Sequence, residues 1–343
     1  MSLKDGYSGF KQDLTNIANA IREKKGIKRK MTLNEMEKLL EKDEGIISLF
    51  LDENSLDVDN EIDYLLNNSD KGYFLPEMDT EISFENYPYA KKLVNYAFYN
   101  SSTSNNPGLK GLKLGTIEVI GERACQNCYN LEYVIAPEVR EIEDRAFYGT
   151  ISTLEPKLSS FSAKKVKKIG ALAFAGTTGR PKILNTLEID CGEEIGTGGF
   201  EEVYFKELIA EKLVTLGQRA FSRNGQLEKI SLPAIQIIPE ESFSFCTKLS
   251  NVDIPKAKVI KKNAFTSCPS LKELYLPEVE EISKDSFDNS LEKLYIGNKF
   301  KICKLDTFWY SSTVVYVPSH LVNKYKKDIY WKNLTILPLS ESD

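Results

Sequence analysis

The sequence predicts an α+β solenoid, a stack of about ten repeats of 21–27 residues with short parallel strands on its concave face. Three columns of residues predict this fold. An aromatic column, a column of small residues one position earlier and an aliphatic column five positions earlier recur along the middle of the chain. A strand of three to five residues cannot bury its apolar side alone, but stacked copies bury the same columns as continuous ladders.

The three columns hold in each of the ten repeats. The aromatic column is Phe98, Cys125, Phe147, Phe174, Phe200, Phe221, Phe243, Phe265, Phe287 and Phe308. The small-residue column is Ala97, Ala124, Ala146, Ala173, Gly199, Ala220, Ser242, Ala264, Ser286 and Thr307. The aliphatic column is Leu93, Ile120, Ile142, Ile169, Ile195, Leu216, Ile238, Ile260, Ile282 and Cys303. Columns that hold this well predict a core that runs the length of the array.

Each repeat then continues into a short strand. Its signal is a triplet of apolar residues, such as Leu271, Leu274 and Leu276, followed by proline. In the longer repeats the triplet comes five residues later, after the polar or turn-forming segments 101–108 and 150–157. Insertions at one place in a repeat predict loops on one side of the solenoid.

The regular repeats carry a family resemblance. The segment from Val259 to Pro277 has Ile260, Ala264, Phe265, Cys268, Leu271, Leu274 and Leu276 at their repeat positions. It resembles the BspA-type leucine-rich repeats of bacterial and some protist surface proteins. The resemblance implies a leucine-rich-repeat array and a non-enzymatic binding or adhesion scaffold, and it specifies no ligand.

The N-terminal segment, residues 1–45, does not follow the repeat. Leu14, Ile17 and Ile21 have helical spacing, and Thr32 with Glu35 forms a capping-box pattern for a second helix. The strings around Ala20–Gly26 and Met31–Met36 resemble a segment of phage and prophage structural proteins of Gram-positive hosts. The resemblance implies an attachment or trimerisation segment, whereas an ordinary helical hairpin with a basic loop accounts for the same residues.

The rest of the chain divides into three parts. Residues 46–92 are predicted to include a cap over the first repeat, residues 93–318 form the solenoid, and residues 319–343 form a C-terminal cap. In that cap Ser319 is the candidate N-cap of a helix through Leu321, Val322, Tyr325 and Ile329, followed by Trp331 and a strand at 334–337. Caps are expected because an open solenoid end exposes its core.

The composition excludes several classes of protein. The formal charge is −5, 41% of the residues are hydrophobic and His320 is the single histidine. These values oppose a disordered chain, a general nucleic-acid binder and a histidine-centred triad or metal site. The sequence starts without a signal peptide and has no 18-residue apolar run, which predicts no membrane insertion and, for a complete chain, no classical secretion.

Three motifs resemble chemical sites, and the repeat explains two of them. Cys125 and Cys128 have the spacing of a redox or metal motif. However, Cys125 occupies the aromatic column, Cys128 occupies the column of Cys246 and Cys268, and Cys303 fills the aliphatic column. A core role is therefore predicted for these cysteines. The glycine-rich segment 192–199 is read as a loose repeat. The acidic segment 57–63 lacks the glycine and final acid of a calcium loop. We therefore expect no catalytic residue, no metal and no cofactor.

One exposed column is the candidate site. The residue between the last two core positions of each strand points to the open face, and this column reads Lys113, Ile135, Ser162, Glu188, Ile209, Ser231, Asp253, Tyr275, Tyr295 and Tyr316. Glu273 and Lys293 lie in the neighbouring exposed column. The three consecutive tyrosines suit contact with sugar or peptide, and a cross-strand ladder that only stabilises the sheet is the alternative.

The sequence supports three functions. The leading hypothesis is a virion protein, that is, a tail-associated component of a phage or prophage. It attaches through residues 1–45 and recognises a host-surface protein or glycan. The resemblance to phage appendages also suggests a homo-oligomer. The first alternative is a bacterial cell-surface or secreted adhesin. The second is an intracellular interaction scaffold.

Overall fold

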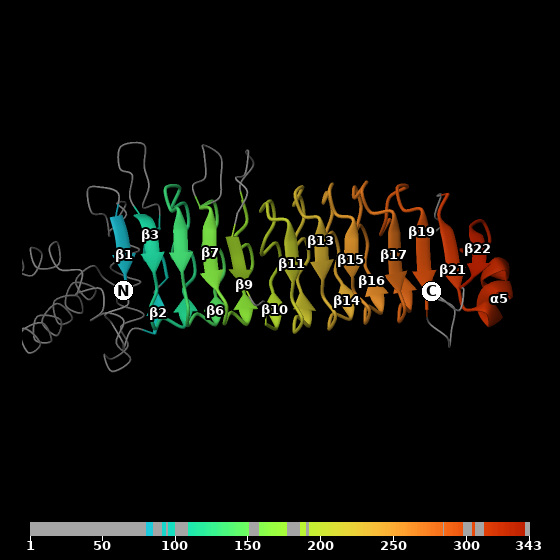
Figure 1. Ribbon diagram of the computed structural model, residues 1–343, viewed down its shortest axis with the longest axis horizontal. Coiled ribbons are helices and arrows are strands. Elements are labelled where there is room, and N and C mark those ends of the chain that lie inside the picture. The colour runs from blue at the N-terminus through green and yellow to red at the C-terminus, as the bar shows by residue number, and fades with distance from the viewer. Residues whose placement is uncertain are drawn as a thin grey trace, which may run out of the picture.

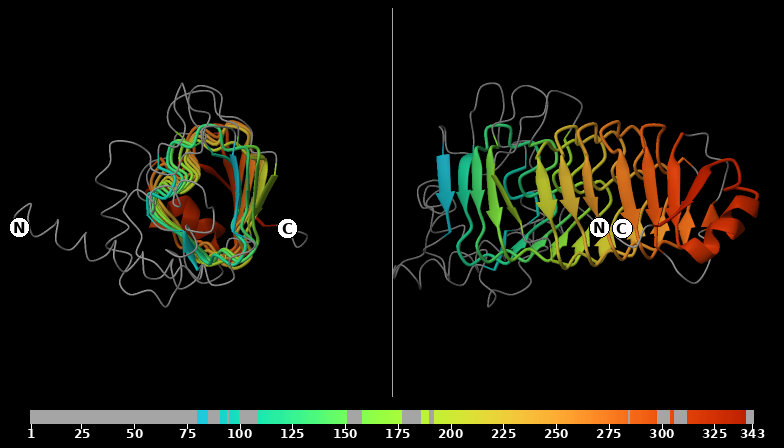
Figure 2. Two further views of the ribbon diagram at one scale, coloured as in Figure 1. Left: turned by 90° about the vertical axis from the view of Figure 1, so that its left-hand side faces the viewer. Right: turned by 45° about the vertical axis from the view of Figure 1, so that its right-hand side comes forward.

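Two rows of parallel strands run along the solenoid, because each coil contributes one long and one short strand (Figure 1). The computed structural model describes residues 80–84, 91–93, 95–99, 109–150, 158–176, 186–189, 192–283, 285–297, 304–305 and 312–339. The predictions for residues 1–45, for the acidic segment 57–63, and for Cys303, Thr307 and Phe308 lie outside these residues. Viewed along the axis, the coils superimpose closely (Figure 2).

The long strands form the predicted open face. They are β1 (Thr80–Ser83), β3 (Leu109–Lys113), β5 (Tyr133–Ile135), β7 (Ser160–Ala163), β9 (Thr186–Ile189), β11 (Glu207–Ile209), β13 (Lys229–Ser231), β15 (Asn251–Asp253), β17 (Glu273–Leu276), β19 (Lys293–Ile296), β21 (Val314–Val317) and β22 (Thr335–Pro338). Hydrogen bonding divides the row into three sheets, β1-β3-β5-β7-β9, β11-β13-β15 and β17-β19-β21-β22. The row thus includes β1, from the predicted N-terminal cap, and β22, from the predicted C-terminal cap.

The short strands contain the aliphatic column. They are β2 (Lys92–Leu93), β4 (Val119–Ile120), β6 (Glu141–Ile142), β8 (Lys168–Ile169), β10 (Glu194–Ile195), β12 (Thr215–Leu216), β14 (Ile237–Ile238), β16 (Val259–Ile260), β18 (Glu281–Ile282) and β20 (Lys304–Leu305). In the last coil Leu305 is the residue that pairs with Ile282, and it is buried. The residue of this column in the last coil is thus Leu305, and the constant repeat spacing, which assigns Cys303, falls two positions short.

A third side of the coils is a turn around the aromatic-column residue, and in several coils, such as that of Phe221, the residues two positions before and after it are left-handed. Arg219 and Arg223 have φ angles of 56° and 60° and flank Phe221. The N–H groups of these three residues donate to carbonyl oxygens of the next coil at 3.1, 2.9 and 2.7 Å. Non-glycine residues disfavour this backbone region, so the regular hydrogen bonds between coils offset a conformational cost that recurs along the stack.

The core is one continuous set of ladders. The aromatic column, from Phe98 to Phe287, and the aliphatic column, from Leu93 to Ile282, are buried, as are the strand triplets around Leu112, Phe161 and Leu274. Successive phenylalanine rings from Phe147 to Phe287 stack with centroids 5.0–5.7 Å apart and planes within 11°. These contacts confirm the columns that the repeat predicts.

The C-terminal end is closed by a short helical segment. Residues Ser319–Leu321 form a 3₁₀ turn (η1), and Val322–Lys327 form the helix α5. Tyr325 of this helix is buried, and so is Trp331, which follows the helix. Ser319 is not an N-cap: Pro318 precedes η1, its carbonyl accepts the Leu321 N–H at 2.8 Å, and no side chain caps either segment. The helix also ends before Ile329, which is exposed. No helix within the described residues is long and apolar enough to cross a membrane.

Candidate binding face

The long-strand row presents two outward columns of side chains, and the predicted candidate residues lie in them. Strand pairing aligns Tyr275 with Tyr295 and Tyr295 with Tyr316, and it aligns Glu273 with Lys293. The same pairing aligns Lys113, Ile135 and Ser162 at the other end of the row. The repeat register therefore assigns the exposed column correctly, and the structure brings all five candidate residues together on one sheet.

The three tyrosine rings differ in how they lie. Tyr295 and Tyr316 are stacked, with ring centroids 4.7 Å apart and planes 12° apart. The ring centroid of Tyr275 lies 6.0 Å from that of Tyr295, and the two ring planes are 47° apart. Tyr275 is also 44% exposed, whereas Tyr295 and Tyr316 are half-buried. We call Tyr275, Tyr295 and Tyr316 the tyrosine row.

An ion pair borders the tyrosine row. Lys293 Nζ donates to Glu273 Oε1 at 2.6 Å, and both side chains are largely exposed to solvent. The hydrogen bond and negative charge of Glu273 raise the pKa of Lys293. The pair leaves this side of the row without net charge.

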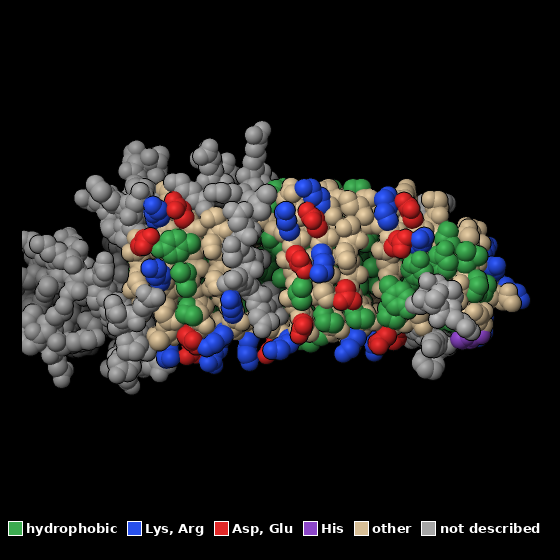
Figure 3. Space-filling model, viewed as in Figure 1, with side chains coloured by type: hydrophobic (Ala, Val, Ile, Leu, Met, Phe, Trp, Pro, Cys, Tyr) green, Lys and Arg blue, Asp and Glu red, His purple; other side chains and the backbone are tan. Residues whose placement is uncertain are grey.

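The structure adds apolar residues that the sequence reasoning missed. Leu337 of β22 aligns with Tyr316 and is 39% exposed, and Val314 aligns with Lys293 and is half-buried. In Figure 3, hydrophobic side chains gather at this C-terminal end of the face, over β17 to β22. The alternation of Leu334, Thr335, Ile336 and Leu337 is the signal that points to an outward Leu337.

A tyrosine at the other end of the face has a different role. A Cβ atom on Gly111 would lie 2.4 Å from the Tyr133 ring, so that ring lies directly across the glycine. Desolvation raises the pKa of Tyr133 to about 12, and the hydrogen bond and charge of Glu81 act in the same direction. Tyr133 thus covers the backbone of its neighbour and bonds to the strand beyond it.

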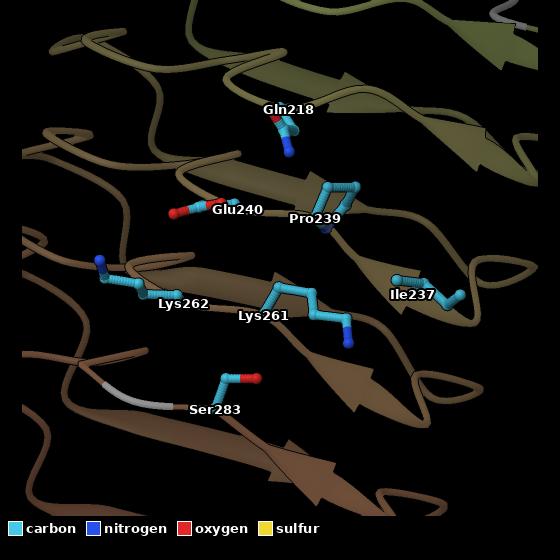
Figure 4. Close-up of a pocket in the computed structure, with 7 residues that line it drawn as sticks. All are labelled: Gln218, Ile237, Pro239, Glu240, Lys261, Lys262 and Ser283. Atoms are coloured by element: carbon cyan, nitrogen blue, oxygen red, sulfur yellow. The ribbon is translucent and has the colours of Figure 1, made fainter. Parts of the chain in front are cut away.

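The short-strand side offers a second candidate, a shallow hollow of about 480 Å³. It crosses the coils of β12, β14, β16 and β18 and is lined by Gln218, Ile237, Pro239, Glu240, Lys261, Lys262 and Ser283 (Figure 4). Lys261 Nζ lies 4.0 Å from Glu281 Oε1. Lys261 and Lys262 extend in opposite directions in Figure 4, so their ammonium groups do not converge on one anion.

Elsewhere this side bears ion pairs between coils. They include Lys91–Glu118 at 2.9 Å, Lys92–Glu143 at 3.0 Å, and the looser Lys168–Glu141 and Lys167–Glu193 pairs, both at 3.5 Å. Exposed pairs of this kind contribute little to stability, on the order of 0–1 kcal/mol each. Alternating charge makes the short-strand side a weaker candidate for binding than the tyrosine row.

The four cysteines that the structure describes are core residues, and three of them have a hydrogen-bonding role. Cys125, Cys128, Cys246 and Cys268 are buried free thiols. The thiols of Cys128, Cys246 and Cys268 donate to the carbonyl oxygens of Phe98, Phe221 and Phe243 in the preceding coil, at 3.0–3.2 Å. Burial raises the pKa of Cys125 and of Cys246 well above the usual value, which disfavours the reactive thiolate.

The remaining motifs are also accounted for. Ile195 and Gly199 are buried in repeat register, with Ile195 paired to Ile169 and Leu216, which confirms the loose repeat at 192–199. His320 is exposed. Within the described part of the chain, no three or more His, Cys, Asp or Glu side chains are grouped so that they could hold a metal ion.

The chain matches one family model, described as the BspA type leucine-rich repeat region, in six copies over residues 91–190 and 193–315. The match covers more than half of the chain, including the long strands from β3 to β19. It excludes residues 1–45, and none of the comparisons supports the resemblance of that segment to phage or prophage proteins. No curated protein matches the chain.

One of the similar solved structures shows the same fold. A leucine-rich repeat protein from Bacteroides ovatus ATCC 8483 is 20% identical, with a TM-score of 0.54, over 74% of this chain and 64% of that one. This chain therefore spans less than two thirds of that protein. A leucine rich cell surface protein from Faecalibacterium prausnitzii A2-165 is 17% identical, with a TM-score of 0.34, over 78% and 88% of the two chains. The pneumococcal vaccine antigen PcpA is 16% identical, with a TM-score of 0.32, over 74% and 85%.

Proposed function

Because the chain belongs to the family of proteins with a BspA-type leucine-rich repeat region, we propose that it is a non-enzymatic binding protein of a bacterial surface. In this role the solenoid is a scaffold that holds the long-strand face toward a protein or glycan on another surface. The attachment of a phage particle through residues 1–45, the hypothesis that the sequence alone favours, has no support beyond the N-terminal resemblance. A bacterial surface adhesin, which the sequence offers as the first alternative, is better supported than a phage component.

The observation that carries the proposal is the tyrosine row. The same outward column holds lysine, isoleucine, serine and aspartate in other coils with the same strand geometry. The fold therefore does not require tyrosine at this position. Three adjacent tyrosines on one sheet provide rigid, amphipathic area of the kind that is enriched in binding surfaces.

Binding of the labelled full chain to cultured epithelial cells tests the proposal. We expect the chain to bind in a saturable way, and we expect the Tyr275→Ala/Tyr295→Ala/Tyr316→Ala variant to bind at least tenfold more weakly. The matched control is Val214→Ala/Phe245→Ala, which removes exposed apolar side chains outside both the long-strand face and the hollow on the short-strand side. Absence of binding, or equal losses in the two variants, contradicts the proposal.

A further inference from the structure

The geometry of the tyrosine row divides it into two kinds of surface. Tyr295 and Tyr316 stack within 12° of parallel, so each ring covers part of the face of the other and the pair offers ring edges and hydroxyl groups. Tyr275 is inclined 47° to Tyr295 and keeps 44% of its surface exposed. Tyr275 is therefore the tyrosine of the row best placed to receive a flat ligand.

Short polar side chains lie on the strands that precede Tyr275, beside Lys229 of β13, whose ammonium group pairs with Glu207 Oε1 at 2.7 Å. β15 is the neighbour of β17 in the row, and β13 pairs with β15 (Figure 1). Their outward residues include Asn251 and Asp253, both exposed, and Ser231, which donates its hydroxyl to Asp253 Oδ2 at 2.6 Å. An amide, a carboxylate and a hydroxyl thus lie on the N-terminal side of an exposed aromatic ring, with no long side chain at these three positions.

The charge around Tyr275 suits an uncharged ligand. Glu273 lies two residues before Tyr275 on the same face, and its charge is compensated by Lys293 at 2.6 Å. Asp253 is engaged by a hydroxyl rather than by a cation in the contacts that the structure gives it. A strongly anionic ligand would meet two carboxylates here, while a neutral ligand with many hydroxyl groups would find both acceptors and donors.

From these observations we propose that Tyr275, Asn251 and Asp253 form a subsite for a neutral sugar ring. The apolar C–H face of the sugar packs on the Tyr275 ring, and its hydroxyl groups bond to the Asp253 carboxylate and the Asn251 amide. The edges and hydroxyls of Tyr295 and Tyr316 extend the surface toward the C-terminal end for a further sugar unit. This inference rests on the proposed function and names the ligand as a neutral glycan.

Two measurements on the full chain test the subsite. In the first, epithelial cells are treated with mild periodate, which cleaves sugar diols, and binding of the chain is compared with mock-treated cells. In the second, a panel of neutral oligosaccharides built from glucose, galactose, mannose and N-acetylglucosamine is titrated into the chain. We expect periodate to abolish cell binding, and at least one oligosaccharide to bind with an affinity that changes less than twofold between 50 and 500 mM salt.

Single variants then identify the residues. Tyr275→Ala is expected to weaken sugar binding at least tenfold, Tyr275→Phe less than threefold because the ring is kept, and Asp253→Asn about three- to tenfold. Glu211→Gln is the control, because Glu211 is exposed in an earlier coil and the substitution removes the same charge as Asp253→Asn.

The outcomes separate this inference from the proposed function. If the cells bind the chain equally after periodate and the tyrosine variant still loses binding, the ligand is a protein, and the sugar subsite is wrong while the proposed function stands. Binding that weakens steeply with salt identifies a charged ligand and also overturns the sugar subsite. If untreated cells do not bind the chain at all, both proposals fail.

Discussion

Two ladders of aromatic rings run along this molecule, one inside the coils and one on the face of the long strands. The inner ladder, from Phe147 to Phe287, has one stacked ring per coil and is buried throughout. The outer ladder, the tyrosine row, has similar ring spacing but is half-buried or exposed, and it spans only three coils. Similar stacking thus occurs in two settings: the inner ladder recurs in each coil from Phe147 to Phe287, and the outer ladder occupies a column where other coils have different residues.

The sharpest way to break the comparison is to remove one ring from the inner ladder. Phe221 lies between Phe200 and Phe243, with centroid distances of 5.7 and 5.4 Å, and is fully buried. We expect Phe221→Ala to lower the free energy of unfolding by about 3–5 kcal/mol, because it removes buried apolar area and leaves a cavity between coils. Denaturant titration followed by circular dichroism measures it, and a loss below 1 kcal/mol would show that the inner ladder is not what holds the coils together.

A smaller loss of stability is expected when the thiol that donates to the inner ladder is removed. Cys246 donates to the buried Phe221 carbonyl oxygen at 3.2 Å. Cys246→Ala should cost about 1–3 kcal/mol, since it leaves that acceptor unsatisfied, and Cys246→Ser should recover part of the loss because the hydroxyl can donate instead. The same denaturant titration compares the two variants, and equal losses would mean that volume, and not the hydrogen bond, explains the cysteine column.

Removing a ring from the outer ladder should have a still smaller effect on stability. Tyr295→Ala breaks one stacked contact on a sheet face, and cross-strand pairs of this kind contribute roughly 0.2–1 kcal/mol. We expect a loss of about 1 kcal/mol, together with weaker binding to cells. A loss as large as that of Phe221→Ala would make the outer ladder a structural device.

The smallest effect is expected at the ion pair beside the row. The pKa of Lys293 is raised by Glu273, so the pair contributes at neutral pH and its contribution is lost as the pH rises through the raised pKa of Lys293. Lys293→Gln should lower the free energy of unfolding at pH 7 by less than Tyr295→Ala does, because solvent screens this exposed pair. Unfolding at pH 7 and above the lysine pKa measures the difference, which should vanish at the higher pH.

Most of the fold is predictable because each coil repeats the same burial pattern. The columns around Phe221 and Ile238 specify which side chains face inward, and strand alternation then specifies that Tyr275 and Tyr295 face outward. The short strands are less predictable, because two residues with one buried side chain carry no periodic signal. The sequence also mispredicts the column residue of the last coil, which is Leu305. The number of residues between Ile282 and Leu305 differs from the regular repeat length, and residue types alone do not show that difference.

The geometry of the candidate site is only partly predictable. Repeat register aligns Tyr275, Tyr295 and Tyr316, but the inclination of each ring depends on how neighbouring coils pack, and no sequence pattern specifies it. Leu337 joins the row only because β22 continues the sheet beyond the last complete repeat. The sequence thus indicates the face, and the structure indicates which ring on it is open to a ligand.

The most direct measurement is a paired one on Tyr275→Ala/Tyr295→Ala/Tyr316→Ala, in which cell binding and the free energy of unfolding are determined on the same preparation. We expect at least a tenfold loss of binding and a decrease in the free energy of unfolding of less than about 3 kcal/mol, which is the sum for three outward cross-strand positions. Unchanged binding by a folded variant, or a collapse of the fold, would contradict the claim that the outer ladder serves binding while the inner ladder serves stability.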